Sequence, residues 1–360
     1  MRLAVAGGKT GGHIYPAVSV IEALERENGQ SEVLWLGRAG GPEEEVARAR
    51  GWSFAAVRAA EVRGMGLRAP IGAAAGLLGA VGAARRLRAF GAETVLATGG
   101  FVSVPGVLGA RLAGVPVLVL LPDVRPGWAV RFLRHFASLV AVTCEGACRY
   151  LGRTRTVQSG YPVRQDFYAC TRAEARSRLG LDERPAVLVM GGSTGSESLN
   201  RAAVRWAPSL VPAAQVIHVS GRKDHSWVSE QARELGLDAA VGYHLHAYLE
   251  ELPEAMIAAD LVISRAGASV LGEIPAAGKP VILVPGSFSD QWENARYLEG
   301  KGCAVVIDNE DVEEKLGAAV LGLLGDPDLR SEMAARAGAL SRPGAARELA
   351  CLLIGLARRS

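Results

Sequence analysis

The sequence predicts an α/β protein built from two Rossmann-like domains, each with a parallel β-sheet covered by helices on both faces. Three observations lead to this prediction. Short apolar runs rich in Val, Ile and Leu alternate with longer amphipathic runs along almost the whole chain. The alternation occurs in two halves, separated by a polar stretch at residues 160–182 that is rich in Arg and Asp. Glycine-rich turns follow several apolar runs, as is usual where a parallel strand leads into a helix.

Seven short apolar runs in the first half are predicted to be buried parallel strands. They are residues 3–6, 33–36, 54–57, 94–97, 117–120, 139–142 and 156–158. Amphipathic runs between them, among them residues 16–27 and 43–50, are predicted to be helices. Strands that are apolar throughout, rather than alternating with polar residues, indicate a sheet with helices on both faces.

The second half repeats this pattern with six further candidate strands. They are residues 186–190, 216–219, 239–241, 261–263, 281–284 and 304–307, separated by helical runs such as residues 173–179 and 226–235. We therefore expect an N-terminal domain at residues 1–163 and a C-terminal domain at residues 164–340, with a cleft between them. Residues 341–360 are helical in pattern and are expected to pack back on the N-terminal domain.

The composition excludes several classes of protein. Of the 360 residues, 49% are hydrophobic and 21% are charged, which is typical of a folded globular chain. The net charge of +3 is too small for a strong nucleic-acid footprint. The five Cys are scattered without a CxxC pair, which favours reduced thiols in a cytosolic protein and no metal site. The first apolar run is too short for a signal peptide, and the low-charge run at residues 69–84 is too short for a membrane span.

Three glycine-rich turns each follow a predicted strand and precede a predicted helix. They are Gly7-Gly8-Lys9-Thr10-Gly11-Gly12-His13, Gly99-Gly100-Phe101-Val102-Ser103 and Gly191-Gly192-Ser193-Thr194-Gly195-Ser196. Glycine lets a backbone approach a phosphate closely, and the start of a helix supplies N–H donors. Three such turns predict a phosphorylated ligand. The first is not a P-loop, because Leu3 stands where that motif requires glycine, and it lacks the dinucleotide motif GxGxxG.

A fourth corner, from Ile263 to Glu273, has the same strand–turn–helix pattern. Its turn consists of small residues, and the free N–H groups there suit an anionic or polar ligand at the carboxyl edge of a sheet. The helix is expected to begin at about Ala268, which places Glu273 about one turn into it, where a carboxylate can accept hydrogen bonds from a sugar diol. In the first glycine turn, His13 stands at a helix start, where an imidazole can donate to a phosphate or act as a general base.

Together these motifs resemble the MurG family, the inverting N-acetylglucosaminyl transferases of peptidoglycan synthesis. The resemblance covers nearly the whole chain. It rests on six segments in the same order and spacing: GGKTGGHIYPA from Gly7, TGGFVSVP from Thr98, GYPVR from Gly160, GGSTGSESLN from Gly191, SRAGASVLGEI from Ser264 and DQWENA from Asp290. It implies the GT-B fold and transfer of GlcNAc from UDP-GlcNAc to lipid I, undecaprenyl-pyrophosphoryl-MurNAc-pentapeptide, without a cofactor or a bound metal.

The resemblance also implies roles for individual residues. His13 corresponds to the position proposed in the family as base or charge stabiliser. The residues that would face the acceptor are Gly11, Gly12, His13, Gly99 and Gly100, and Thr10, Gly11 and Gly12 would also approach the sugar being transferred. On the donor side, Arg164 and Ser193 would contact the nucleotide, Leu249 the uracil, Ala268 and Ser269 the α-phosphate, Glu273 the ribose, and Gln291 and Asn294 the GlcNAc hydroxyls.

The chain departs from the family on the acceptor side. Lys9 replaces the third glycine of the first turn, and residues 120–127 replace a segment that in the family usually contains His-Glu-Gln-Asn. Asp123 stands at the Asn position, where a carboxylate can abstract a proton, so it is a second candidate base; alternatively, it caps a turn beside Pro122. This difference keeps open a GT-B transferase that uses a UDP-sugar on another glycolipid or natural product. A non-catalytic nucleotide-sugar-binding protein is disfavoured, because His13, Glu273 and Gln291 are all present.

The implied acceptor is a membrane lipid, and two basic segments suit a membrane surface. Arg63, Arg68, Arg85, Arg86 and Arg88 flank the apolar residues 71–84, and Trp128, Arg131, Phe132 and Arg134 follow the altered segment. Basic and aromatic residues beside apolar surface favour contact with anionic headgroups, although a buried helix with solvated ends gives the same pattern. We therefore expect a peripheral protein on the cytoplasmic face of the plasma membrane. Association with other cell-wall synthesis proteins is compatible with this location.

Overall fold

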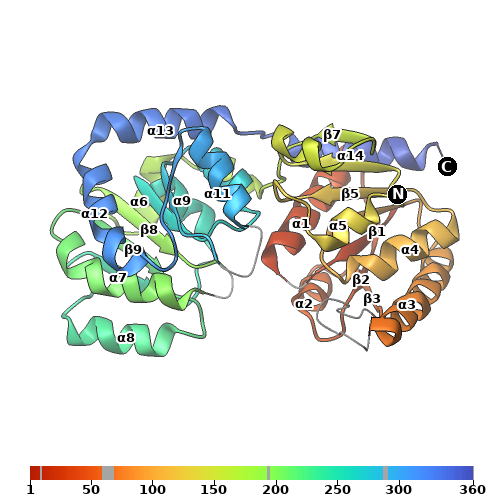
Figure 1. Cartoon of the computed structure of the whole chain (residues 1–360), viewed down its shortest axis with the longest axis horizontal. Helices are drawn as coiled ribbons and strands as arrows, with labels where there is room; N and C mark the ends of the chain where they lie inside the picture. Colours follow the sequence, from red (N-terminus) through yellow and green to blue (C-terminus); the bar gives the residue numbers. More distant parts are fainter. Residues whose placement is uncertain (9, 59–68, 193–194, 287–290, 360) are drawn as a thin grey trace. The chain divides into compact units, whose positions relative to one another are not determined.

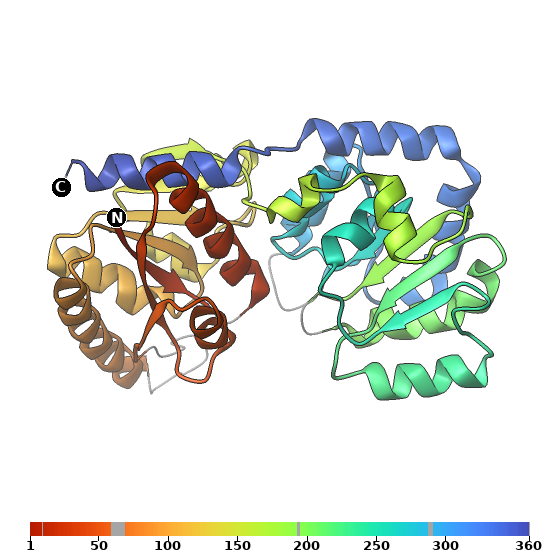
Figure 2. The same ribbon diagram turned by 180° about the vertical axis from the view of Figure 1, so that it is seen from behind.

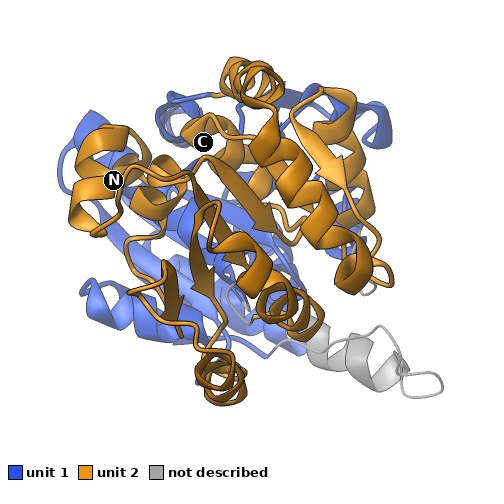
Figure 3. Cartoon of the chain, turned by 90° about the vertical axis from the view of Figure 1, so that its left-hand side faces the viewer, with its two compact units in different colours: residues 1–163, 342–360 blue, residues 164–341 orange. Residues whose placement is uncertain are grey.

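The computed structural model describes residues 1–8, 10–58, 69–192, 195–286 and 291–359, with the backbone alone for residues 69–77. The chain divides into two compact units, coloured blue and orange in Figure 3. Unit 1 comprises Met1–Val163 and Arg342–Ser360, and unit 2 comprises Arg164–Ser341. Each unit has its own parallel sheet and its own hydrophobic core, so the predicted α/β class is confirmed.

Unit 1 is built on a seven-stranded parallel sheet with the strand order β3-β2-β1-β4-β5-β6-β7. The strands are β1 (Arg2–Gly7), β2 (Glu32–Gly37), β3 (Ser53–Ala56), β4 (Thr94–Gly99), β5 (Val117–Leu121), β6 (Leu139–Val142) and β7 (Thr156–Gln158). The helices of its described part are α1 (Gly11–Asn28), α2 (Pro42–Ala49), α3 (Ala69–Phe90), α4 (Ser103–Ala113), α5 (Trp128–Leu133), the 3-10 helix η2 (Glu145–Tyr150) and α14 (Ala345–Ala357). Every strand predicted for this half is present.

Helices cover both faces of the unit 1 sheet (Figures 1 and 2). Val5 of β1 belongs to the same buried cluster as Leu24 of α1 and Leu349 of α14. The next residue, Ala6, faces the opposite side, where α4 packs so closely that a Cβ on Gly106 would lie 2.5 Å from that of Ala6. Successive side chains of a strand point to opposite faces, so both faces must be apolar. This packing explains the continuous apolar runs in the sequence.

Unit 2 has a six-stranded parallel sheet with the strand order β10-β9-β8-β11-β12-β13. The strands are β8 (Ala186–Met190), β9 (Gln215–Val219), β10 (Tyr243–His246), β11 (Leu261–Ser264), β12 (Val281–Leu283) and β13 (Ala304–Val306). The helices of its described part are η3 (Gln165–Tyr168), α6 (Arg172–Arg178), α7 (Glu197–Leu210), α8 (His225–Glu234), α9 (Leu252–Ala258), α10 (Val270–Ala277), α11 (Gln291–Gly300), α12 (Val312–Gly325) and α13 (Pro327–Ala339). Its core packs Val189 and Ile263 of the sheet with Leu199 of α7 and Leu316 of α12.

Strand order changes direction at one point in each sheet. In unit 1, β1 lies between β2 and β4, and in unit 2, β8 lies between β9 and β11. Ligands of open parallel sheets bind outside the carboxyl ends of the strands at such a switch point. The carboxyl ends of β1 and β4 lead into the first two glycine turns, and those of β8 and β11 lead into the third turn and the Ile263–Glu273 corner. Each unit therefore brings two of the four corners together at one edge.

One predicted strand is wrong. Residues 239–241 form a turn, and the strand β10 begins only after it, at Tyr243. The carboxylate of Asp238 accepts hydrogen bonds from the N–H groups of Ala240 and Val241, at 2.9 and 3.2 Å, and Gly242 has a φ of 95°. A short side chain that binds the backbone two residues later stabilises a turn over a strand. His244 and His246 lie in this strand.

The C-terminal segment consists of the two helices α13 and α14. It is interrupted at residues 340–344, which contain Pro343, so that α13 belongs to unit 2 and α14 to unit 1. The α14 helix packs against α1, and Arg347 Nε lies 2.7 Å from Glu27 Oε1. Proline lacks an N–H and clashes with the preceding turn, which explains the break.

A chain of buried hydrogen bonds connects β9, β10 and α7 in unit 2. The fully buried His218 has its Nδ1 2.6 Å from the Tyr243 hydroxyl and its Nε2 3.0 Å from Asn200 Oδ1. The Asn200 Nδ2 donates to the Ser220 carbonyl and to Asp224, which identifies Oδ1 as the acceptor. His218 therefore carries its proton on Nε2 and accepts from Tyr243 on Nδ1. Burial, together with nearby His225, lowers the pKa of His218 to about 3, so the ring is neutral.

We expect His218 to make unit 2 less stable in acid. The pKa of histidine is about 6.5 in the unfolded chain and about 3 in this fold. Between these pH values the unfolded state binds more protons than the folded state, so the free energy of unfolding decreases as the pH is lowered. From pH 7 to pH 5 the loss is about 2 kcal/mol. Urea unfolding at both pH values should show that the wild type loses about 2 kcal/mol more than His218→Gln. An equal loss in both proteins would mean that His218 is not buried as a neutral ring.

Candidate active site

The β1–α1 turn at residues 7–13 is supported by buried side chains. The indole Nε1 of Trp35 donates to the Gly7 carbonyl at 2.9 Å. The buried Thr98 places its Oγ1 where a Cβ on Gly7 would lie, so a larger residue would collide with β4. The first glycine is thus required by packing between two strands.

Glu43, in the first turn of α2, also supports this turn. The residue is fully buried, and its Oε1 accepts a hydrogen bond from the Arg38 N–H at 2.8 Å. A Cβ on Gly8 or Gly41 would collide with its carboxyl group, which therefore lies directly against the turn. In the sequence, Glu43 begins a run of three glutamates that is typical of a solvated helix start. Its supporting role was not predicted and depends on packing between elements.

His13 lies in the first turn of α1, beside the second glycine turn. Its Nδ1 is 2.7 Å from the carbonyl oxygen of Thr98. A carbonyl oxygen only accepts, so Nδ1 carries a proton, and the neutral ring keeps a free electron pair on Nε2. Gly99 and Gly100 have φ values of 97° and 75°, and a Cβ on Gly99 would lie 3.2 Å from His13 Cε1. The structure thus brings His13 together with Gly99 and Gly100 in the tautomer that a general base requires.

The carbonyl oxygen of Gly12 lacks its usual helical hydrogen bond because of a proline. Pro16 lies inside α1 and lacks the N–H that would bond to Gly12 four residues before it. The hydroxyl of Tyr161, in the GYPVR segment, donates to this oxygen instead, at 3.2 Å. No described residue accepts a hydrogen bond from the amides of Gly11 and Gly12, and the exposed Thr10 makes no capping bond with its side chain. These groups are available to a ligand at the start of α1.

The Ile263–Glu273 corner lies at the carboxyl end of β11 in unit 2. The chain turns after Ser264, and α10 begins at Val270, two residues later than predicted. In the part of the chain that the structure describes, no group accepts from the amides of Ala268 and Ser269. Both amides lie at a helix start, where N–H groups and the helix dipole favour a phosphate.

Glu273 faces this corner from the first turn of α10. Burial raises the pKa of its carboxyl group, while a hydrogen bond from the Ser269 side chain and the charge of Arg164 act in the opposite direction. Arg164 also donates from Nη1 to the carbonyl of Glu250 at 3.3 Å, beside Leu249. The structure therefore brings Arg164 near Glu273 and near the segment that contains Leu249, and the contact of these residues with a nucleotide stays a prediction. A half-buried carboxylate beside a guanidinium suits a polar ligand such as a diol.

Gln291 and Asn294, which were predicted to bind the sugar of UDP-GlcNAc, form hydrogen bonds with the backbone of neighbouring loops. The Oε1 of Gln291 accepts from the Gly286 N–H at 2.8 Å. Asn294 is fully buried, and its Nδ2 donates to the Ala266 carbonyl at 3.0 Å. Their contact with a sugar stays a prediction. Ser193 lies outside the described residues.

Arg265 is a further residue of this corner, and no role was predicted for it from the sequence. Its Nη1 lies 2.7 Å from Asn309 Oδ1 and 3.1 Å from the Val284 carbonyl, and its Nη2 lies 2.8 Å from Ser198 Oγ. All of these partners are neutral, and within the described ranges no carboxylate forms an ion pair with the guanidinium. Burial lowers the pKa of Arg265. A positive charge without an ion-pair partner among the described residues thus lies at the base of the corner.

Known proteins match almost the whole chain in sequence. The glycosyltransferase family 28 N-terminal domain matches residues 3–142, and the family 28 C-terminal domain matches residues 186–349. A relative from Roseiflexus sp. strain RS-1 is 38% identical over 98% of this chain and 94% of its own length. A relative from Symbiobacterium thermophilum is 37% identical over 100% of this chain and 97% of its own. Both are named UDP-N-acetylglucosamine–N-acetylmuramyl-(pentapeptide) pyrophosphoryl-undecaprenol N-acetylglucosamine transferase.

A solved structure points to the same family. MurG from Acinetobacter baumannii is 25% identical, with a TM-score of 0.75 over 98% of this chain and 99% of that chain. The chain belongs to the MurG family. This agrees with the resemblance stated from the sequence motifs, and the family 28 domains account for both parallel-sheet units.

The segment in which this chain differs from the MurG family pattern lies at the carboxyl end of β5. Leu120, Leu121 and Pro122 are buried, and Asp123 is half-buried in the bend that follows the strand. Because β5 neighbours β4, Asp123 lies at the same edge of the sheet as the Gly99 turn. Its role as a second base stays a prediction, and Lys9, the other difference, lies outside the described residues. Among the residues that are described, no group of three or more His, Cys, Asp or Glu is arranged to hold a metal ion.

Proposed function

We propose that this protein transfers N-acetylglucosamine from UDP-GlcNAc to the 4-hydroxyl of MurNAc in lipid I, with inversion at the anomeric carbon, to give lipid II. The full-length match to relatives named as this transferase carries the proposal, at 38% identity over 98% of the chain. Two anion-binding corners at the switch points of the two sheets support it. The reaction uses the donor UDP-GlcNAc and needs no resident cofactor.

The donor end of the reaction is assigned to unit 2. Displacement of UDP builds negative charge on its phosphates, and the amides of Ala268 and Ser269, at the start of α10, donate to that charge. Arg265 adds a fixed positive charge beneath them. Glu273 accepts from the ribose hydroxyls, the backbone at Leu249 binds the uracil, and Arg164 contacts the nucleotide. These groups are preorganised by the fold, so that little reorganisation is needed when the bond to the sugar breaks.

The acceptor end is assigned to unit 1. Attack by the 4-hydroxyl requires removal of its proton, and the Nε2 of His13 has the free electron pair for this step. The amides of Gly11 and Gly12 donate to the acceptor diphosphate, and the turn at Gly99 and Gly100 leaves room beside the imidazole. Direct attack on the face opposite UDP converts the α-linked donor into a β-linked product.

A transfer assay tests the proposed acceptor. The full chain is incubated with UDP-GlcNAc and lipid I, and lipid II is detected by mass; we expect product that increases with enzyme concentration. The altered segment around Asp123 favours a second candidate, a transferase that uses another glycolipid or natural product as acceptor. UDP-GlcNAc binding without transfer to lipid I would reject the leading proposal and direct the search to that candidate.

A membrane-binding surface on unit 1 fits a lipid-linked acceptor. Trp128 and Phe132, which are 51% and 38% exposed, stack with ring centroids 5.9 Å apart, beside the exposed Arg125 and Arg131. Apolar rings beside basic side chains insert at an interface that carries anionic lipids. On the helix α3, Leu78 is 64% exposed, whereas Arg63 and Arg68 lie outside the described residues. None of the helices in the described ranges has the length and apolarity needed to cross a bilayer. The proposed location is peripheral, at the cytoplasmic face of the plasma membrane.

We expect loss of the aromatic pair to weaken membrane binding. The double variant Trp128→Ala, Phe132→Ala should bind vesicles of phosphatidylglycerol and phosphatidylcholine about tenfold or more weakly, because it removes the apolar contact with the interface. Co-sedimentation with the vesicles measures this. The matched control is Leu235→Ala, Leu329→Ala in unit 2, where both side chains are also exposed. Equal binding by the two double variants would place the membrane contact elsewhere.

A further inference from the structure

Tyr161 lies just before the point at which the chain leaves unit 1. The first segment of this unit ends at Val163, and its second segment begins at Arg342. Gly160 has a φ of 87°, and a Cβ at this position would lie 2.7 Å from the Cβ of Arg342. The backbone beside Tyr161 is therefore packed against the segment that returns to unit 1, and Tyr161 itself is only 5% exposed. This packing leaves the phenol little room to move.

The Tyr161 hydroxyl binds the peptide group that precedes His13. It donates to the Gly12 carbonyl oxygen at 3.2 Å, and Pro16 has no N–H with which to form that bond. The N–H of the same peptide group belongs to His13 and donates to the Thr10 carbonyl at 3.0 Å. A peptide group is planar, so hydrogen bonds at its oxygen and at its nitrogen together fix its orientation. The Cα of His13 is part of this plane and is fixed with it.

The imidazole of His13 depends on the position of that Cα. Its Nδ1 lies 2.7 Å from the Thr98 carbonyl oxygen, and this bond keeps the electron pair on Nε2. Gly12 is half-buried, so without the Tyr161 hydroxyl its carbonyl oxygen would turn toward water. The peptide plane would rotate with it and move the imidazole away from Thr98. The tautomer of His13 is thus linked to a phenol that is distant in the sequence.

We propose that Tyr161 is a positioning residue for His13 in the transfer reaction proposed above. It acts through the Gly12–His13 peptide and not by contact with a substrate. Its hydroxyl holds the imidazole so that Nε2 faces the acceptor hydroxyl with a free electron pair. This role rests on the proposed function, in which His13 is the base. The segment GYPVR then serves both sides of the reaction, since Arg164 at its end lies near Glu273.

The variant Tyr161→Phe removes the hydroxyl and keeps the ring. We expect kcat with lipid I to fall about 10- to 100-fold, because a small misplacement of a catalytic group is costly, while the KM for UDP-GlcNAc stays within about twofold. NMR of the histidine ring nitrogens in the ligand-free protein, at about pH 8.5 where imidazole is neutral, reports the tautomer. We expect one tautomer of His13 in the wild type and a mixture in Tyr161→Phe. His13→Ala identifies its signals among those of the six histidines.

A second substitution restores the missing hydrogen bond by another route. Pro16→Ala supplies a backbone N–H that can donate to the Gly12 carbonyl within the helix. The double variant Tyr161→Phe, Pro16→Ala should therefore recover most of the lost kcat and the single tautomer of His13. A tyrosine that only stabilised the fold would not be replaced in this way. Urea unfolding shows that each variant is folded at the assay temperature.

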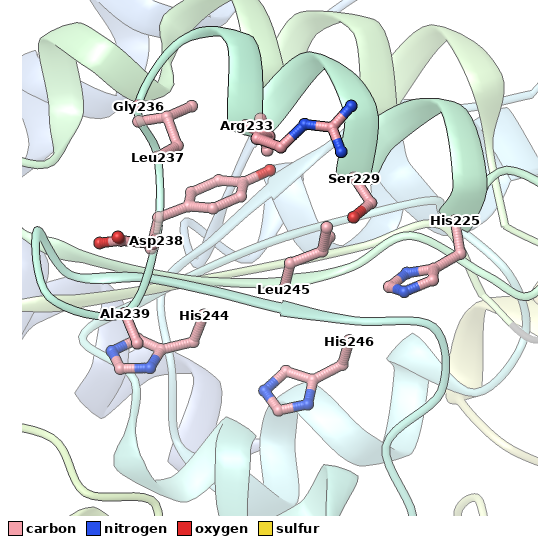
Figure 4. A pocket seen from close by; sticks show the side chains of 12 residues that line it. His225, Ser229, Arg233, Gly236, Leu237, Asp238, Ala239, His244, Leu245 and His246 are labelled. Carbon is pink, nitrogen blue, oxygen red and sulfur yellow. The ribbon is translucent and has the colours of Figure 1, made fainter.

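Tyr243→Phe is the matched control, because it removes a buried tyrosine hydroxyl from unit 2. That hydroxyl lies 2.6 Å from His218 Nδ1. Tyr243 lines a pocket between α8 and β10, and none of the residues assigned to a substrate lines this pocket (Figure 4). The control should keep kcat within about twofold of the wild type and leave the His13 signals unchanged.

Two results would overturn the proposal. One is wild-type kcat in Tyr161→Phe. The other is a lower kcat with unchanged His13 signals and no recovery through Pro16→Ala. If the wild type transferred no sugar to lipid I, the proposed function would fail instead, and the His13 signals of Tyr161→Phe would still decide whether Tyr161 positions the imidazole.

Discussion

Replacing His13 with alanine is expected to lower kcat about 10²- to 10⁴-fold, the usual contribution of a positioned general base. The affinity for UDP should stay within about twofold, because the groups assigned to the nucleotide belong to the other unit. The expected loss of kcat follows from the tautomer of His13. The Thr98 carbonyl accepts from Nδ1 at 2.7 Å and so holds the free electron pair on Nε2, and among the described residues of this turn no other side chain is a base. Turnover with lipid I and UDP binding by calorimetry measure the two quantities.

Asp123→Asn is the control for this prediction, because it removes the other candidate base with little change of shape. If His13 is the base, Asp123→Asn should reduce kcat far less than His13→Ala does. The reverse order of effects would assign the proton transfer to Asp123. If both single variants kept full activity, neither residue would be the base, and the proposed mechanism would be wrong.

Most of the fold was predictable because buried parallel strands have a local signal. Each of the seven runs predicted to be strands in unit 1 corresponds to a strand, and the same holds for the predicted strands of unit 2 except at the edge of its sheet. The strand β10 contains His244 and His246, and one of its two edges is unpaired, so it lacks the continuous apolar character of the central strands. Ala239 to Val241 carry the apolar signal but form a turn, because the Asp238 carboxylate binds their backbone. At residues 239–241 the hydrogen bonds from the backbone to a side chain stabilise a turn, although the apolar composition favours a strand.

The residues of the candidate site also fall into two groups, those with a local signal in the sequence and those whose role depends on distant partners. The positions of His13 and Glu273 in the first turns of their helices were predictable, because each lies in a motif whose strand–turn–helix pattern is local in the sequence. Glu43 was not, since its burial depends on the approach of α2 to the β1–α1 turn. Tyr161 and Arg265 lie in named motifs, yet their roles arise from partners far along the chain, Gly12 for one and Asn309 for the other. A sequence without coordinates does not show such pairs.

Arg265→Met is expected to weaken UDP binding about 30- to 150-fold, which corresponds to about 2–3 kcal/mol. The guanidinium is half-buried, and its hydrogen-bond partners in the described part of the chain are all neutral, so these partners do not compensate its charge. A bound diphosphate would compensate that charge. Methionine fills similar space without charge, so the variant removes the attraction to the phosphates.

The stability of the ligand-free protein separates this role from a purely structural one. Replacing a poorly compensated buried charge with an apolar side chain is often neutral for stability, so we expect Arg265→Met to unfold in urea within about 1 kcal/mol of the wild type. Arg205→Gln, on the exposed face of α7, removes a charge of the same sign and should change neither quantity. If Arg265→Met bound UDP as tightly as the wild type but unfolded more easily, the residue would only link the loops that meet at Asn309 and Ser198. If UDP affinity fell and stability did not, the positive charge at the base of the corner would serve the donor phosphates.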